Sequence, residues 1–268
     1  MTKPALLKIG KFRCSWQALA TLLMYVFMYA PIAVLGVYSF NKSRYGAIWE
    51  GFSIRWYRRL LGDTRLFAAL GDSLTIALCA VAVSAILGTL MAIGLSKYRF
   101  PGKSLYLGMS YLPLIIPDIA IAVATLVFLS SIALPLSIWT AIAAHMVFCL
   151  AYIAVVVSSR LKGLDPNLEE AALDLGATPT QALTKVLLPQ LMPAILSGCL
   201  LAFVLSMDDL LISSFTAGGA NPLPIEIFSR VKTGIKPDIN ALSVLLILGS
   251  SLVAALSEYF RFKSDQTG

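Results

Sequence analysis

The sequence predicts an all-α integral membrane protein with six transmembrane helices. Hydrophobic residues make up 58% of the 268 residues and charged residues only 13%, whereas about a quarter of a soluble domain is charged. Mean hydropathy is +0.82. Six apolar runs approach the ~20 residues that cross a bilayer as a helix. None of them alternates apolar and polar residues as a barrel strand does, so helices are expected.

The apolar runs define the expected helices. They lie at residues 16–40, 72–96, 105–130, 136–158, 191–215 and 241–262. Basic residues precede the first run, but the run is too long for a signal-peptide core and has no small-residue cleavage site. We therefore expect it to remain as the first membrane helix. The whole chain is interpreted as one transmembrane domain: a first helix with an outer loop (1–71), a five-helix core (72–262) and, within that core, a cytoplasmic polar loop (160–190).

The connections indicate the orientation. An even number of helices places both termini on one side, and the short connection at 97–103 carries Lys97, Arg99 and Lys103. Short cytoplasmic loops are enriched in Lys and Arg, so both termini are expected in the cytoplasm of a multi-pass inner-membrane protein. Lys and Arg residues next to the membrane helices account for the net charge of +7. No basic tract with interleaved aromatics suggests nucleic-acid binding.

Neither the cysteines nor the single histidine suggests a metal site. The cysteines are isolated, without metal-ligand spacing, and are expected to be small buried hydrophobes: Cys14, Cys79, Cys149 and Cys199. His145 lies in an apolar run, without a zinc-protease motif or serine elbow nearby, and is expected to be a hydrogen-bonded helix contact.

Two outer loops carry amphipathic segments. In 41–71, Ser53 is placed to cap a short helix that mixes aromatic residues and arginines, which suits a headgroup-level anchor or a docking surface for an external partner. In 217–240, residues 223–232 could form an amphipathic helix that lines an outer opening or packs on the bundle.

Acidic residues occur inside two apolar runs. Pro113 and Pro117 should kink or open the third helix, with Asp118 in the break. Asp208 and Asp209 in the fifth run, followed by Ser213, would project about 100° apart on one helix. A buried carboxylate is costly in a bilayer, so these residues indicate a path for a cationic solute. The alternatives are a structural cap at Asp118 and merely interfacial charges at Asp208 and Asp209.

The polar loop has the signals of two short helices around a bend. Asp165 and Pro166 suit the start of the first helix, and Glu169 and Glu170 lie in its first turn, where the helix dipole favours negative charge. Leu168, Ala171, Ala172 and Leu175 have the spacing of one helix face.

Gly176 is placed to stop this first helix. Thr178, Pro179 and Gln181 then form a capping-box pattern for the second helix. On spacing alone, an ordinary solvated loop with two helical turns is an equal alternative.

The polar loop resembles the EAA motif of ABC-importer permease subunits. The matching positions are Glu170-Ala171-Ala172, Gly176, Val186 and Leu188-Pro189, with Val where the family more often has Ile. The resemblance implies a type I importer permease fold with a cytoplasmic coupling helix between transmembrane helices 4 and 5. It also implies that Glu170 and its alanines lie at the surface that docks on an ATPase subunit, with Gly176 at the bend.

Further segments resemble the polyamine (putrescine/spermidine) branch of these permeases, across nearly the whole chain. They are Ser206-Met-Asp-Asp-Leu, Ser214-Phe-Thr-Ala-Gly, Lys236-Pro-Asp-Ile-Asn-Ala-Leu, Gly51-Phe-Ser-Ile-Arg-Trp-Tyr and Lys97-Tyr-Arg-Phe-Pro-Gly-Lys. The resemblance implies a heterodimer with a second permease, two ATPase subunits and a periplasmic solute-binding protein.

The predicted function is therefore transport without catalysis. The sequence contains no GxxxxGK[ST] phosphate loop, so ATP is expected to be hydrolysed by another chain and no cofactor is expected on this one. One alternative is an importer of the same architecture for an amino-acid derivative or iron. A distant alternative is an intramembrane aspartyl enzyme, against which the glycine-aspartate signature of such proteases is missing.

Overall fold

The computed structural model describes residues 16–43, 48–234 and 237–266, and side chains as far as residue 252. Cys14, Lys236 and the basic residues ahead of the first run lie outside these ranges. The chain divides into two compact units, residues 1–62 with 231–268 and residues 63–230. Each unit is described by itself, and the division of the chain predicted above stays a prediction.

The first unit contains α1 (Trp16–Tyr38), α2 (Arg55–Leu61) and α12 (Pro237–Gln266). Helix α12 packs against both α1 and α2. The first and sixth apolar runs are thus helical, as predicted. None of the residues of α1 is buried, so most of the surface of this apolar helix is left for lipid or another chain.

The loop before α2 is held by Asn41. Its Oδ1 accepts the backbone N–H groups of Ser43 at 3.2 Å and Glu50 at 3.0 Å, and its Nδ2 donates to the carbonyl of Ile48 at 2.7 Å. The short helix predicted after Ser53 is confirmed, although Ile54 occupies the N-cap position. Trp56 is buried and donates to the Asn41 carbonyl at 2.8 Å.

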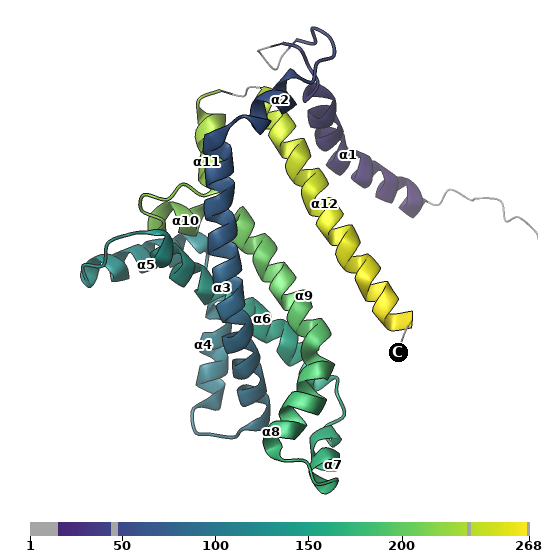
Figure 1. Ribbon diagram of the computed structural model, residues 1–268, viewed down its shortest axis with the longest axis vertical. Helices are drawn as coiled ribbons and strands as arrows, with labels where there is room; N and C mark the ends of the chain where they lie inside the picture. The colour runs from purple at the N-terminus through teal and green to yellow at the C-terminus, as the bar shows by residue number, and fades with distance from the viewer. Residues whose placement is uncertain (1–15, 44–47, 235–236, 267–268) are drawn as a thin grey trace, which may run out of the picture. The chain divides into compact units, whose positions relative to one another are not determined.

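The second unit is a bundle built on α3 (Thr64–Lys97), α6 (Ile138–Lys162) and α9 (Leu188–Asp208), which pack on one another (Figure 1). Ile153 of α6 is fully buried at the centre. A Cβ on Gly198 of α9 would lie 3.2 Å from the Cα of Ile153, and one on Gly88 of α3 would lie 3.0 Å from the carbonyl oxygen of Leu150. Small residues therefore set the close approach of these helices.

Helix α3 begins at Thr64, earlier than the predicted start of the apolar run at residue 72. The Asp63 carboxylate caps it by accepting the N–H of Leu66 at 3.1 Å. Leu66 and Ala69 are buried in the added turns. The cap and this packing extend the helix beyond the predicted apolar run.

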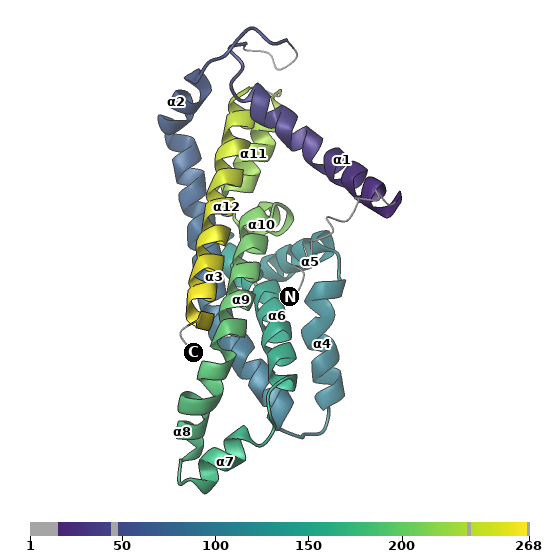
Figure 2. The ribbon, with the colours of Figure 1, turned by 90° about the vertical axis from the view of Figure 1, so that its right-hand side faces the viewer.

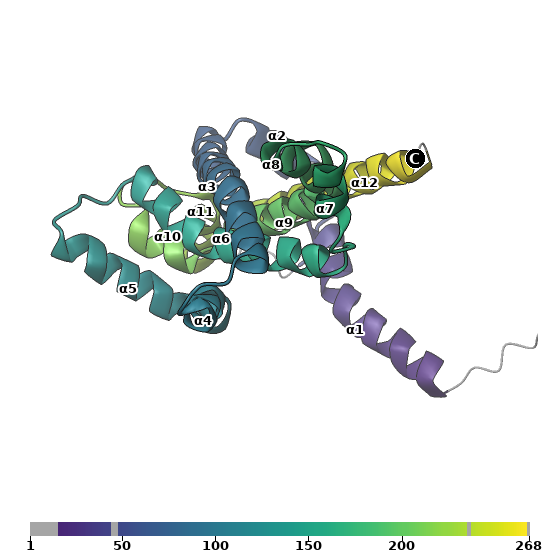
Figure 3. The same ribbon diagram turned by 90° about the horizontal axis from the view of Figure 1, so that it is seen from below.

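The third apolar run is broken, as its prolines predict. Helix α4 (Lys103–Ile115) and helix α5 (Asp118–Ser131) meet at an angle of 109°. Seen along the bundle, α5 leaves sideways from the end of α4 (Figure 3). Pro113 stays inside α4, and the break falls at Ile116 and Pro117.

Within the described residues, four helices are long and apolar enough to cross a membrane, and the α4–α5 pair could supply a fifth span. These four are α1, α3, α6 and the continuous helix Pro179–Asp208. Helix α12 covers the sixth predicted run, of which Pro237–Leu252 is the apolar helical part with described side chains. The all-helical class is confirmed, and the count of six spans stays a prediction.

Short helices complete the second unit at its two ends. Helix α7 (Leu168–Asp174) and helix α8 (Pro179–Gln181), with the π-helix Ala182–Leu187, lie at the same end as the α3–α4 connection (Figure 2). Helix α10 (Leu211–Thr216) and helix α11 (Leu223–Lys232) lie towards the opposite end. Helix α11 has the bounds predicted for the amphipathic helix of the last outer loop.

Candidate functional site

The polar loop (residues 160–190) folds as two helices around a sharp bend. Gly176 has φ +88°, a left-handed conformation that side chains disfavour. Its N–H donates to the carbonyl of Leu173 at 2.9 Å, and the N–H of Ala177 donates to that of Ala172 at 3.0 Å. This pair of bonds is a Schellman motif, so the predicted helix stop at Gly176 is confirmed.

The second half of the polar loop is capped as the sequence predicts. The Gln181 N–H donates to the Thr178 hydroxyl oxygen at 3.3 Å, and the Thr178 N–H donates to the Gln181 side-chain oxygen at 2.9 Å. Helix α7 differs from the prediction at its start: Asn167, not Asp165, occupies the N-cap position. The Asp165 carboxylate instead accepts the N–H of Asn167 at 2.9 Å, which closes a turn before the helix.

The bend carries an exposed surface with apolar and acidic residues. Helix α7 has no buried residue. Leu175, at the end of α7, is 90% exposed, and Glu170 and Ala171 are exposed while Ala172 is partly covered. Together with the 40% exposed Leu173, Leu175 gives the bend an apolar surface that this unit does not cover.

One ion pair ties the polar loop to the bundle. Lys97, the last residue of α3, pairs with Glu169 in the first turn of α7. The pair is partly exposed, with about a third or less of each side chain accessible. Glu169 therefore contacts this chain, whereas Glu170 projects outward.

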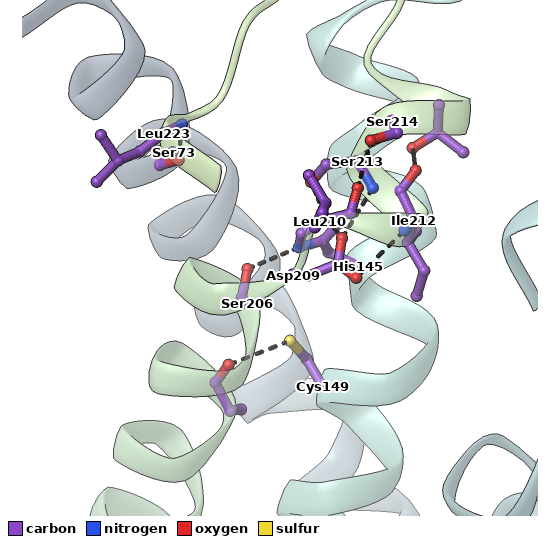
Figure 4. Close-up of polar contacts among 12 residues, drawn as sticks. Ser73, His145, Cys149, Ser206, Asp209, Leu210, Ile212, Ser213, Ser214 and Leu223 are labelled. Atoms are coloured by element: carbon purple, nitrogen blue, oxygen red, sulfur yellow. Dashed lines mark hydrogen bonds and ion pairs between the residues drawn. The ribbon is translucent and has the colours of Figure 1, made fainter. Parts of the chain in front are cut away.

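A buried polar cluster lies deeper in the same unit, and we call His145, Ser206, Asp209 and Ser213 the His145 cluster (Figure 4). His145 of α6 is fully buried. Its Nδ1 hydrogen-bonds the Ser206 hydroxyl at 2.7 Å, and its Nε2 hydrogen-bonds the Ser213 hydroxyl at 3.0 Å. Nε2 also lies 3.2 Å from Oδ2 of Asp209. The prediction that His145 is a hydrogen-bonded helix contact is confirmed.

The two neighbouring aspartates have different surroundings. Helix α9 ends at Asp208, so the expectation that Asp208 and Asp209 share one helix is wrong. Asp209 is extended, and its carboxylate accepts the N–H groups of Ile212 at 3.2 Å and Ser213 at 2.8 Å, at the start of α10. The Asp209 side chain is 9% exposed, whereas Asp208 is exposed.

Asp118 is exposed at the first position of α5. Pro117 is the N-cap residue, and no side-chain hydrogen bond caps the helix. The alternative of a structural cap is therefore not favoured by the geometry. Helices α5 and α10 pack on each other, so the helix that starts at Asp118 adjoins the one that Asp209 caps.

At the opposite end from the polar loop, α11 is joined to the start of α3 by charges. Arg230 pairs with Asp63 and with Glu226, each at 2.8 Å. The hydrogen bond from Arg230 lowers the pKa of the Glu226 carboxyl below its ordinary value. Burial raises the pKa of Asp63, but the Leu66 N–H and the Arg230 guanidinium outweigh it and lower that pKa. Both carboxylates thus stay ionised over a wider acidic range.

Some residues of these sites were missed by sequence reasoning. The sequence predicts only loop orientation for Lys97, although it pairs with Glu169, and predicts no contact for Ser206, which hydrogen-bonds His145. The spacing of seven between Ser206 and Ser213 is a signal for one helix face, but the helix breaks between them. Their common partner, His145, could not be assigned from spacing.

Comparison with known proteins identifies related transport subunits. Residues 84–264 match the family "Binding-protein-dependent transport system inner membrane component". The chain is 43% identical over 265 residues to the putrescine transport system permease protein PotI of Escherichia coli K12, covering 95% of this chain and 93% of PotI. It is 42% identical over 243 residues to the spermidine/putrescine transport system permease protein PotC of Haemophilus influenzae, covering 90% of this chain and 95% of PotC.

The fold is also found among solved importers. A bacterial ABC transporter involved in the import of the acidic polysaccharide alginate matches with a TM-score of 0.71 and 16% sequence identity, over 96% of this chain and 99% of that chain. At this identity the match establishes the arrangement of the helices and leaves the solute open.

Proposed function

The chain belongs to the inner membrane components of binding-protein-dependent transport systems, and from this premise we propose that it carries a polyamine such as putrescine or spermidine. One observation carries the proposal: relatives named for polyamine transport are 42–43% identical to it over at least 90% of its length. The exposed acidic residues suit a solute whose amines are protonated at neutral pH.

The chain is a permease subunit of an ABC importer and not an enzyme. Its relatives are transport permeases, and ATP is used by a separate ATPase subunit. The family functions in the inner membrane with a solute-binding protein. The chain's own task is therefore mechanical: it supplies part of the membrane passage and a surface that receives force.

We assign that surface to the polar loop. Glu169, Glu170, Ala171, Ala172, Leu175 and Gly176 form the proposed contact with the ATPase subunit, in which Leu175 inserts as the apolar anchor. A single exposed leucine beside small alanines lets a partner approach closely and desolvate it. This assignment places the polar loop and both termini in the cytoplasm.

The complete assembly is proposed to hold this chain, a second permease as its heterodimer partner, two ATPase subunits and the periplasmic binding protein. Closure of the ATPase pair would move the polar loops together, and the bundles attached to them would open the outer side. The Lys97–Glu169 ion pair would transmit that movement directly to α3.

The solute path is proposed to involve Asp118, Asp208, Asp209 and Ser213. Asp118 and Asp208 are exposed and available to an ammonium group. Asp209 and Ser213 act from within the His145 cluster, where they shape the end of the path without being open to it. An importer for another small solute, such as an amino-acid derivative or iron, is the competing candidate.

Uptake measurements test the solute. A strain lacking its own polyamine importers receives the complete transporter, and uptake of radiolabelled putrescine is measured against unlabelled spermidine, ornithine and ferric citrate. We expect competition by spermidine and none by ferric citrate. Transport of ferric iron or ornithine in preference to either polyamine would overturn the assignment.

Cross-linking tests the polar loop separately. A cysteine replacing Leu175, in a chain whose other cysteines are replaced by serine or alanine, should cross-link to the ATPase subunit in membranes. A cysteine at exposed Leu61 is the matched control and should not. A periplasmic location of reporters fused at residue 176 would contradict the proposed orientation.

A further inference from the structure

The break between α9 and α10 is made without a helix-breaking residue. Proline and glycine are common causes of sharp helix breaks, but residues 206–216 contain neither. The turn is made by side chains instead. Asp209 leaves the helical conformation, and its two carboxylate oxygens take the N–H groups of Ile212 and Ser213. These bonds satisfy backbone groups that a broken helix would otherwise leave unpaired in a membrane.

His145 joins the two sides of this break. Its Nδ1 contacts Ser206, two residues before the end of α9, and its Nε2 contacts Ser213 in α10 and the Asp209 carboxylate between them. Figure 4 shows the ring of His145 between these partners. All three contacts come from a separate helix, α6, so a helix of the bundle core holds the break in place.

The break also determines where the side chain of Asp208 lies relative to Asp209. Asp209 is drawn into the bundle and Asp208, the last residue of α9, is exposed. Had the helix continued, Asp208 and Asp209 would lie about 100° apart on one continuous helix surface, without a break to separate them. The contacts of Asp209 with His145 and with the N–H groups of Ile212 and Ser213 hold this aspartate in the bundle.

We propose that His145 is a positioning residue for solute passage: by holding Asp209 at the break between α9 and α10, it fixes the direction in which Asp208 meets the solute. The inference rests on the proposed role of Asp208 in the solute path. His145 itself has no accessible surface and acts only through the carboxylate it holds.

The test uses the complete transporter in proteoliposomes, with radiolabelled putrescine delivered by the binding protein. The variants are H145L, D208N and the double variant, and KM, maximal rate and permease content are measured for each. C149A is the matched control. Cys149 lies on the same helix, and its thiol contacts the Ala202 carbonyl of α9 at 3.8 Å without touching the break.

We expect D208N and H145L each to raise KM by roughly 3-fold or more, and D208N to add little in the H145L background, because coupled residues are not additive. C149A should leave KM unchanged. Multiplication of the two KM effects in the double variant, or a lower permease content with an unchanged KM in H145L, would overturn the inference.

Two conservative variants, H145Q and H145N, test the inference even if H145L does not fold. The amide of Gln reaches the position of Nε2, beside Asp209, whereas the amide of Asn reaches only that of Nδ1, beside Ser206. H145Q should therefore keep KM near the parent value and H145N should not; equal KM values would overturn the inference. An unchanged KM in D208N would instead remove Asp208 from the path, and with it the premise.

Discussion

The polar loop exposes an apolar side chain, whereas the His145 cluster buries polar ones. Leu175 in the polar loop is apolar and 90% exposed, and His145 is polar and fully buried. His145 finds its partners within the chain, on α9 and α10. Leu175 finds none in its own unit. The difference teaches that a buried polar residue is explained by partners within the chain, whereas an exposed apolar residue in a polar segment leaves an area for something outside the chain to cover.

The largest expected effect is at Asp209, and it sharpens the contrast between adjacent carboxylates. Asp209→Ala removes the partner of His145 and the cap of α10, and should lower the unfolding free energy by about 3 kcal/mol. Asp208→Ala, at the exposed neighbour, should change it little. Thermal unfolding of the purified transporter in detergent measures both. Equal losses would mean that burial does not distinguish the two residues.

A second prediction concerns the segment that follows α10. Gly218 has φ +61°, and a Cβ there would lie 2.3 Å from the carbonyl oxygen of Leu136. Gly218→Ala should therefore destabilise the protein by about 2 kcal/mol through backbone strain and displacement of the α6 start.

The neighbouring glycine is the control for that prediction. A Cβ on Gly219 would have nothing within 4 Å, so Gly219→Ala should have almost no effect in the same unfolding assay. Similar unfolding temperatures for the two variants would show that the α6–α10 contact tolerates rearrangement.

The third prediction concerns Leu175, the exposed residue of the polar loop. Leu175→Ala should leave stability unchanged, because the side chain buries nothing here, and should weaken binding of the ATPase subunit by about 1–2 kcal/mol, roughly tenfold, because less apolar surface is buried on docking. Pull-down of the ATPase subunit by the permease measures this. Leu61→Ala, at a 70% exposed leucine of α2, should not affect it; a loss of stability in Leu175→Ala would argue for an internal role.

The smallest expected effect is at the Lys97–Glu169 pair. Partly exposed ion pairs contribute about 1 kcal/mol or less, so K97E should reduce putrescine uptake by no more than about fivefold. E169K also alters the proposed ATPase contact, and adding K97E to it restores the attraction and should raise uptake above that of E169K alone. Uptake that stays low in the double variant would show that the two charges act independently, Lys97 through loop orientation and Glu169 through a partner.

Local signals in the sequence predicted the polar loop well. The left-handed turn at Gly176 and the capping box of Thr178 and Gln181 form between residues at most five positions apart. The bounds of α11 and the break before Asp118 follow in the same way from periodicity and proline. Such features depend on neighbours along the chain, so a sequence is sufficient to recognise them.

Contacts between distant residues could not be predicted. The partners of His145 lie 61 and 68 positions away, and Glu169 lies 72 positions from Lys97. The expected continuous fifth helix was wrong at Asp209, where no proline or glycine marks the break. The break combines local bonds from the N–H groups of Ile212 and Ser213 to Asp209 with a contact from His145 of another helix.

The amino-acid sequence alone therefore determined the membrane class, the helical content and the bent polar loop, because apolar length, capping and glycine act over a few residues. Only the tertiary structure decided which of two adjacent aspartates is buried and which is exposed. That choice depends on where α6 places an imidazole, and the cost of an unpaired buried carboxylate makes the choice strict.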